Sequence, residues 1–152
     1  MRQINRIKDG LVNQKKSISF TFNGHILTGY EGDTLASALL ANNKKLVGRS
    51  FKYHRPRGIV TAGSEEPNAI MEIGNGPYKD PNTRATITEL YDGLEANSQN
   101  HKGPLGFDLM AIIDFLSPLV GAGFYYKTFM WPKAFWEKFY EPAIRNAAGL
   151  GT

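Results

Sequence analysis

The sequence of 152 residues contains no cysteine. Without thiols the chain cannot form a disulfide framework, present a thiolate nucleophile, build a cysteine zinc site or hold an iron-sulfur cluster through thiolate ligands. Its three histidines, His25, His54 and His101, stand far apart, with no carboxylate at ligand spacing. The sequence therefore predicts no metal site.

The sequence also lacks a long hydrophobic run and an excess of one charge. The most apolar stretch, residues 105–131, is interrupted by Asp108, Asp114 and Pro118, so a membrane-spanning helix is not expected. Residues 1–16 form a polar, basic arm with no secretory signal core, which favours the cytoplasm, and we assign them no structure. The 18 basic residues are interspersed with 14 acidic ones, so the net charge of +4 permits nucleic-acid binding without indicating it.

A hairpin is the first element that the sequence predicts. Residues 17–22 alternate apolar and polar side chains, and residues 25–30 form a second β-prone run. Asn23-Gly24 lies between them, and both central residues of a type I′ turn need a positive φ. The two runs are therefore expected to pair as antiparallel strands.

A helix follows the hairpin. Leucines recur at helical spacing from Leu35, and Asp33 or Thr34 can cap the first free amides. We expect this helix to end near Asn42 or Asn43.

Further strands are expected at residues 69–73 and, more weakly, at residues 84–90. Residues 91–106 are polar and loop-like. With 41% hydrophobic residues, this order predicts an α+β domain, a small mixed sheet wrapped on a single helix, with a tail.

The tail is helical and aromatic in character. Residues 107–116 have amphipathic helical spacing, and Pro132 suits the first turn of a final helix. More than half of the aromatic residues lie from Phe107 onward, which is typical of a surface made for a partner. The alternative is that the tail folds back on its own domain. The candidate interface residues of the tail are Phe124, Tyr125, Phe129, Trp131, Trp136 and Phe139.

A basic cluster lies between the helix and the next strand. Its members, interleaved with two aromatic residues, are Arg49, Lys52, His54, Arg55 and Arg57. They suit a phosphate or a carboxylate-rich protein surface, because arginine supplies paired donors. A solvated loop and a nucleic-acid contact are the other two interpretations.

Other motifs do not assemble a site. Gly74-Asn75-Gly76 and Gly121-Ala122-Gly123 each begin a G-x-G, but neither completes the dinucleotide fingerprint G-x-G-x-x-G. Glu65-Glu66 is an adjacent acidic pair whose side chains point to opposite sides of an extended segment, so we interpret it as a loop carrying charge. The sequence predicts no catalytic site of its own.

Three long stretches resemble the leading part of the α subunit of heterotetrameric sarcosine oxidase. They cover residues 32–70 (beginning GDTLASALLANN), residues 82–100 (NTRATITELYDGLEANSQN) and residues 123–151. Such subunits begin with a domain similar to a plant-type [2Fe-2S] ferredoxin, a β-grasp fold. The resemblance implies a β-grasp domain over residues 17–100 and a helical docking extension over residues 101–152.

The resemblance also locates the lost ligands of the cluster. Cluster-bearing relatives carry C-x₄-C-x₂-C in the loop after the basic cluster, with a fourth cysteine later. This pattern falls on Thr61, Glu66 and Ala69, with Thr86 at the fourth position. None of these side chains replaces a soft thiolate ligand, so a scaffold without its redox centre is implied.

The function implied is oxidative demethylation of sarcosine by other parts of a complex that contains FAD, FMN and NAD. Because no flavin-attachment or nicotinamide motif occurs in this segment, no cofactor and no catalytic residue are carried over to it. Related amine and opine oxidases use similar segments, so the substrate is left open. We expect a non-catalytic domain that holds the remaining α-subunit domains and the other subunits in place, with no nucleic-acid or membrane partner. The alternative is an independent anion- or nucleic-acid-binding module that uses residues 49–57.

Overall fold

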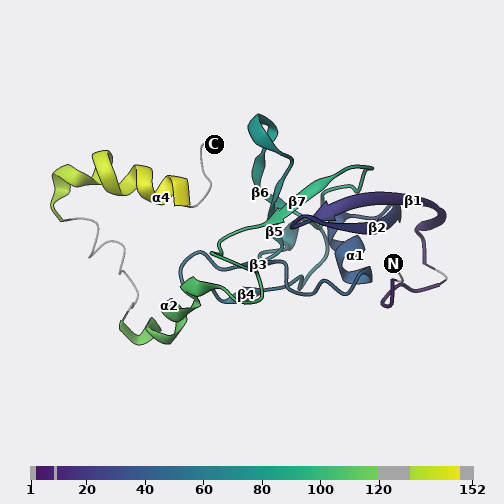
Figure 1. Ribbon diagram of the computed structural model, residues 1–152, viewed down its shortest axis with the longest axis horizontal. Helices are drawn as coiled ribbons and strands as arrows, with labels where there is room; N and C mark the ends of the chain where they lie inside the picture. The colour runs from purple at the N-terminus through teal and green to yellow at the C-terminus, as the bar shows by residue number, and fades with distance from the viewer. Residues whose placement is uncertain (1–2, 9, 120–130, 148–152) are drawn as a thin grey trace.

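The centre of the computed structural model is a five-stranded sheet with the strand order β2-β1-β7-β5-β6 (Figure 1). The structure describes residues 3–8, 10–119 and 131–147. The strands are β1 (Asn13–Phe22), β2 (His25–Glu31), β5 (Ile70–Ile73), β6 (Asp80–Arg84) and β7 (Glu95–Ser98). β1 and β7 run parallel, whereas the other neighbours are antiparallel. Helix α1 (Leu35–Ala41) covers one face of the sheet (Figure 1).

The predicted hairpin is confirmed. Phe22 of β1 pairs with His25 of β2, and Asn23 and Gly24 have φ angles of 50° and 75°. Every second residue at the end of β1 is buried, so Phe20 and Phe22 enter the core. Alternation and turn chemistry therefore act together to set the register of this pair.

The predicted helix is confirmed as well. Thr34 is the N-cap, and it exchanges hydrogen bonds with Ser37 in a capping box. The helix packs closely on β2, because a Cβ at Gly29 would lie 3.1 Å from the Cβ of Ala38 and 2.2 Å from the Leu90 side chain. A larger residue at Gly29 would have to displace the Leu90 side chain.

The basic arm lies against α1 and β2. Arg6 donates to both carboxylate oxygens of Asp33, at 2.8 and 2.6 Å, and Gln3 donates to the Thr28 carbonyl. Strand β1 begins at Asn13, which is earlier than the sequence predicted. Its pairing with β2 has an irregular register between Asn13 and Ser17. Asp33 is buried and also accepts from Ser37 Oγ, so the arm is tied to the residue that precedes the helix cap.

The second half of the sheet differs from the prediction. The weak strand predicted at residues 84–90 is wrong, because β6 ends at Arg84 and residues 85–90 pass along α1 instead. The amides of Leu35 and Ala36 donate to the carbonyls of Thr88 and Ala85, each at 2.9 Å. The predicted strand at residues 69–73 is confirmed as β5.

Strand β7 was missed, because its sequence, EANS, is polar and short. It nevertheless lies between β1 and β5 and bonds to both. The buried side chains of Leu94 and Ala96 anchor it in the core. Its strand conformation comes from two tertiary partners rather than from local propensity.

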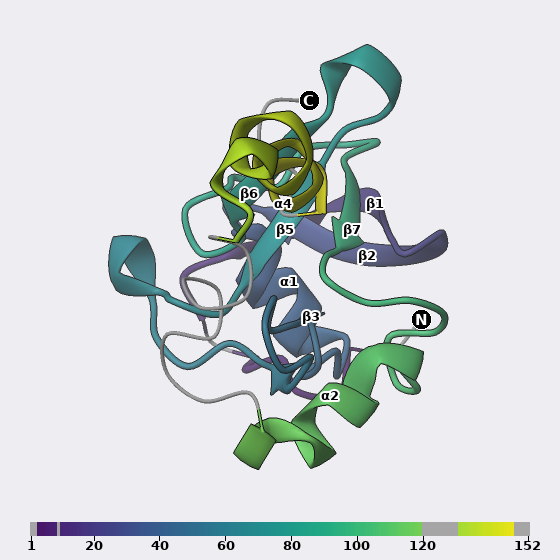
Figure 2. The ribbon, with the colours of Figure 1, turned by 90° about the vertical axis from the view of Figure 1, so that its left-hand side faces the viewer.

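The basic cluster lies in and beside a two-stranded ribbon of β3 (Gly48–Arg49) and β4 (Pro56–Arg57). Beyond β7, the helix predicted at residues 107–116 is broken into shorter pieces. These are 3₁₀ turns at Leu109–Ala111 and Ser117–Leu119, with α2 (Ile112–Phe115) between them. Asp108 is the N-cap of the first 3₁₀ turn, and its side chain accepts from the Met110 amide. Figure 2 shows α2 on the far side of α1 and β3 from the sheet.

The chain described after Pro132 consists of a 3₁₀ turn (Lys133–Phe135), a π-helical turn (Trp136–Tyr140) and α4 (Glu141–Ala147). Figure 1 shows this segment apart from the sheet. Of the helices in the described parts of the chain, none combines the length and the apolar character required to cross a bilayer.

Candidate functional site

The loop between β4 and β5 closes around one carboxylate, that of Glu66. Its Oε2 accepts from the amides of Val60 at 2.9 Å and Thr61 at 2.6 Å, and from Thr61 Oγ1 at 3.1 Å. Its Oε1 accepts from the amides of Asn68 at 2.8 Å and Ala69 at 3.2 Å. Four backbone amides and one hydroxyl thus converge on a side chain that is only 1% exposed.

Three of the four predicted cluster positions lie in this loop, and the fourth, Thr86, lies beside it. Thr61, Glu66 and Ala69 meet at the carboxylate, as described above. Thr86 lies opposite and donates from Oγ1 to the Gly63 carbonyl at 2.6 Å. Arg84, at the end of β6, donates from Nε to the Glu66 carbonyl at 3.3 Å. The loop therefore has the Glu66 carboxylate at its centre, and the side chains of Arg84 and Thr86 hold it from the neighbouring segment.

The surroundings of Glu66 keep it ionised. Burial by itself raises the pKa of a carboxyl group, but the amides of Thr61, Asn68, Val60 and Ala69 together lower the pKa of Glu66 to about 2. Our interpretation of Glu65-Glu66 as a loop carrying charge is confirmed, since both residues lie in this loop, but Glu65 is exposed whereas Glu66 is buried. The loop turns its amides inward, and these amides need a buried acceptor.

The side chains of the basic cluster form hydrogen bonds and ion pairs with neighbouring segments of the chain. Arg49 donates from Nε and Nη2 to the Leu105 carbonyl, at 3.1 and 2.9 Å. His54 Nδ1 lies 2.7 Å from Asp108 Oδ2. Asp108 is buried, which raises its pKa, but hydrogen bonds from the amides of Lys102 and Met110 and from His54 outweigh this effect and lower the pKa. These contacts fix residues 101–111 against the ribbon, a role for Asp108 that sequence reasoning missed.

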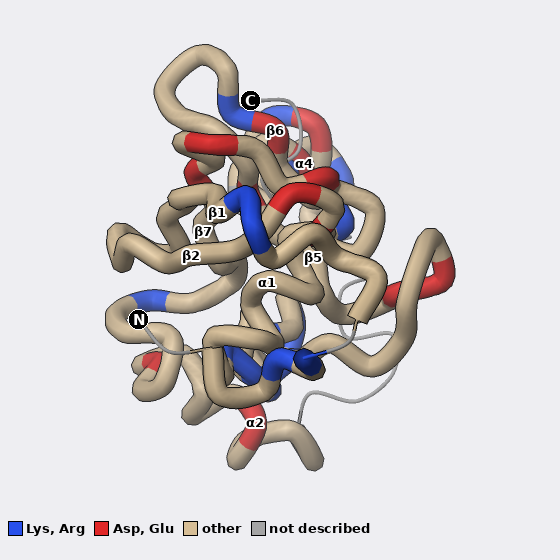
Figure 3. Tube along the Cα trace, turned by 90° about the vertical axis from the view of Figure 1, so that its right-hand side faces the viewer, with Lys and Arg blue, Asp and Glu red and all other residues tan. Residues whose placement is uncertain are grey.

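The outer members of the cluster are also engaged. Arg55 Nε lies 2.7 Å from Asp114 of α2, and Figure 3 shows lysines and arginines gathered next to the acidic position of that helix. Arg57 donates to Asn68 Oδ1 at 2.5 Å. Lys52 and Arg55 each lie 4.7 Å from the centre of the Tyr53 ring. A polyanion would have to compete with these contacts, since most of the cationic groups are already bonded within the chain.

The predicted aromatic interface is partly described. Trp131 and Phe139 are exposed, and Trp136 is half-buried. Phe139 packs edge to face on Phe135, with ring centres 5.3 Å apart. The remaining three candidates, Phe124, Tyr125 and Phe129, lie outside the described residues.

These features define a domain with the fold of a cluster-binding family but without the ligands of a cluster. Residues 15–101 match the family of the 2Fe-2S iron-sulfur cluster binding domain, which is more than half of the chain, and the chain belongs to this family. The ferredoxin-like, β-grasp fold predicted from the sequence is thereby confirmed.

Two relatives of the chain are α subunits of one kind of enzyme. It is 65% identical over 144 residues to sarcosine oxidase subunit alpha of Rhizobium meliloti (strain 1021), which covers 95% of this chain and 15% of that protein. Sarcosine oxidase subunit alpha of Corynebacterium sp. (strain U-96) is 39% identical over 97 residues, 62% of this chain and 10% of that protein. The predicted resemblance to these α subunits is confirmed, although the chain spans only about 15% of the length of the Rhizobium relative.

Among solved structures, the crystal structure of L-proline dehydrogenase from P. horikoshii is similar to this chain. The TM-score is 0.50 at 26% sequence identity, and the match covers 65% of this chain and 18% of that one. The similarity to a second oxidoreductase chain again involves only a small part of the larger protein.

The residues present do not fit the cluster that gives the family its name. A plant-type cluster takes four thiolates, whereas the chain has no cysteine and carries Thr61, Glu66, Ala69 and Thr86 at the four positions. The loop amides already bond to the Glu66 carboxylate. In the described residues, no group of three or more metal-ligating side chains is placed to bind a metal ion.

Proposed function

We propose that this chain is a cluster-free, non-catalytic module of an oxidoreductase α subunit of the sarcosine oxidase type. One observation carries the proposal: the buried Glu66 carboxylate occupies the amides of the loop that binds the cluster elsewhere in the family. A cluster-binding loop that keeps its shape around its own side chain retains a structural role without electron transfer. Catalysis, and the FAD, FMN and NAD that the resemblance implies, would belong to other parts of the complex.

Within such a complex, the module would hold the remaining α-subunit domains. The apolar side chains of the α2 segment support this role, because Phe107 is 73% exposed and Phe115 is 82% exposed. Leu109 and Ile112 add to the exposed apolar surface. Burying a large apolar side chain contributes about 1.5–3 kcal/mol before ordering costs, so several such contacts together would supply much of the attachment.

A co-purification experiment tests the docking role. The tagged chain is co-expressed with the remainder of a sarcosine oxidase α subunit and its other subunits, and the retained protein is quantified. We expect Phe107→Ser combined with Phe115→Ser to reduce the retained protein at least tenfold. Tyr78→Ser is the control, because Tyr78 is 89% exposed in a different part of the molecule, the 3₁₀ turn before β6.

A second variant, Trp131→Ser with Phe139→Ser, tests the predicted aromatic interface in the same assay. Undiminished retention in both double variants would refute docking through these surfaces. The alternative function, anion or nucleic-acid binding by residues 49–57, predicts instead a steep loss of polyanion affinity with added salt.

A further inference from the structure

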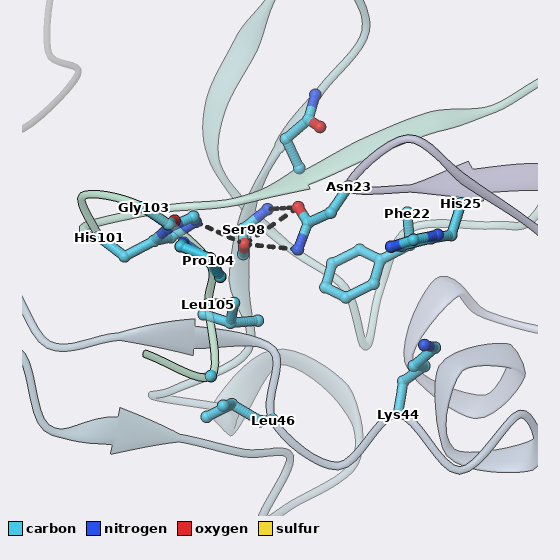
Figure 4. Close-up of a pocket in the computed structure, with 12 residues that line it drawn as sticks. Phe22, Asn23, His25, Lys44, Leu46, Ser98, His101, Gly103, Pro104 and Leu105 are labelled. Carbon is cyan, nitrogen blue, oxygen red and sulfur yellow. Dashed lines mark hydrogen bonds between the residues drawn. The ribbon is translucent and has the colours of Figure 1, made fainter. Parts of the chain in front are cut away.

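A hollow of about 620 Å³ lies at the end of the sheet near the tight β-turn between β1 and β2 (Figure 4). Phe22, Leu46 and Leu105 give it apolar walls, and polar side chains stand at two ends. No aspartate or glutamate is among the described residues that line it. The volume and the mixture of apolar walls with a few polar groups are typical of a small-molecule site.

One end of the hollow carries two groups that suit an anion. Lys44 and His25 both line it, and Figure 4 shows the Lys44 side chain rising toward His25. Within the part of the chain that the structure describes, neither side chain makes a hydrogen bond or an ion pair. Lys44 is partly buried and His25 is exposed, and Figure 4 shows the Lys44 side chain extending into the hollow.

The backbone fixes the position of Lys44. Helix α1 ends in a Schellman motif, in which Asn43 has a φ of 59° and its amide donates to the Leu40 carbonyl. The Lys44 amide then donates to the Leu39 carbonyl at 2.8 Å. His25 is placed by the turn at Asn23, so both groups start from rigid elements rather than from loose loops.

The opposite end is already satisfied. Ser98 Oγ lies 2.8 Å from His101 Nε2, and Asn23 Nδ2 donates to Ser98 Oγ at 2.8 Å. His101 Nδ1 lies 2.8 Å from the Gly103 carbonyl, which only accepts, so Nδ1 carries the proton. The polar groups in this network bond to one another. The end of the hollow with Lys44 and His25 is therefore the end that is available to an anion.

We propose that this hollow binds a small organic carboxylate, with the carboxylate on Lys44 and His25 and an apolar body against Phe22, Leu46 and Leu105. The ammonium group supplies a charge-assisted hydrogen bond, and the walls exclude water from the rest of the ligand. The site is separate from the Glu66 loop and from the exposed surface of the α2 segment. It does not depend on the docking role proposed above.

Benzoate is the probe, added to the full chain and followed by two-dimensional NMR. We expect saturable shifts confined to residues 22–25, 44–46 and 97–105, with millimolar affinity, as suits so small a ligand. Lys44→Gln weakens binding about tenfold, because a hydrogen bond to a charged group is lost. Lys45→Gln is the matched control: it removes the same charge at an exposed neighbour outside the hollow and leaves the affinity within about twofold.

Two further probes separate the contribution of the carboxylate charge from that of the apolar walls. Neutral benzamide is expected to bind at least tenfold more weakly than benzoate, and inorganic phosphate is expected not to displace benzoate. Equal weakening by Lys44→Gln and Lys45→Gln would overturn the proposal, since the attraction would then be a general charge effect. Displacement by phosphate at equal concentration would overturn it too, because the apolar walls would contribute nothing.

Discussion

Replacing Glu66 by glutamine tests the central feature of the loop. The Glu66→Gln variant keeps the shape of the side chain and one carbonyl oxygen, but its NH₂ group is a donor. Two or more of the loop donors on Val60, Thr61, Asn68 and Ala69 would then face another donor inside the protein. A buried polar group without its partner costs about 1–3 kcal/mol.

The lowered pKa of Glu66 gives an independent value for the free energy with which its carboxylate stabilises the folded protein. A change from the ordinary value of 4.5 to about 2 corresponds to at most about 3 kcal/mol of stabilisation. We therefore expect Glu66→Gln to lower the free energy of unfolding by about 2–3 kcal/mol at pH 7.

The pH dependence has a definite sign. The pKa of Glu66 is lower in the folded protein than in the unfolded chain, so its stabilisation is complete above pH 4.5 and is lost as the pH falls toward about 2. The difference in stability between the wild type and Glu66→Gln should therefore shrink over this interval. Comparing the two proteins isolates Glu66 from Asp33 and Asp108, whose pKa values are also lowered.

The assay is urea unfolding followed by far-ultraviolet circular dichroism at several pH values. Tryptophan fluorescence is unsuitable, because both tryptophans, Trp131 and Trp136, lie in the extension. Glu65→Gln is the matched control, and we expect it to change stability by less than about 0.5 kcal/mol, since Glu65 is exposed. Equal stability of the wild type and Glu66→Gln at pH 7, or a difference that does not change with pH, would refute the reasoning.

Two other variants are expected to have measurable effects. Arg6→Gln leaves the buried Asp33 without its ion-pair partner and should cost about 1–3 kcal/mol in urea unfolding; Lys8→Gln, at an exposed site in the same arm, is the control, and equal effects would contradict a specific pair. A fourfold cysteine variant should acquire the visible absorption of a [2Fe-2S] cluster after anaerobic reconstitution with iron and sulfide. A colourless, folded product would show that the loop no longer has the geometry of a cluster site. The cysteines replace Thr61, Glu66, Ala69 and Thr86.

Where local rules decide the structure, the sequence was sufficient. The hairpin at Asn23-Gly24 and the helix capped by Thr34 were predicted and are confirmed, because turn chemistry, capping and periodicity depend on neighbours along the chain. The same local signals gave no warning of β7, which is short and mostly polar and becomes a strand only between two partners. The helix predicted at residues 107–116 is broken in the structure, and the Asp108 side chain at its start contacts His54, which is distant in the sequence.

By itself, the sequence determined that this protein has no thiolate to hold a cluster, and that its cluster positions carry Thr61, Glu66, Ala69 and Thr86. Only the tertiary structure decided what Glu66 does there, because the four amides that bind its carboxylate point inward only once the loop has closed. The common hollow of Lys44 and His25 is of the same kind, since these residues come from different elements and line one hollow only when α1 packs on the sheet. Residue identity limits the available chemistry, whereas the direction of backbone donors and the meeting of distant side chains are properties of the fold.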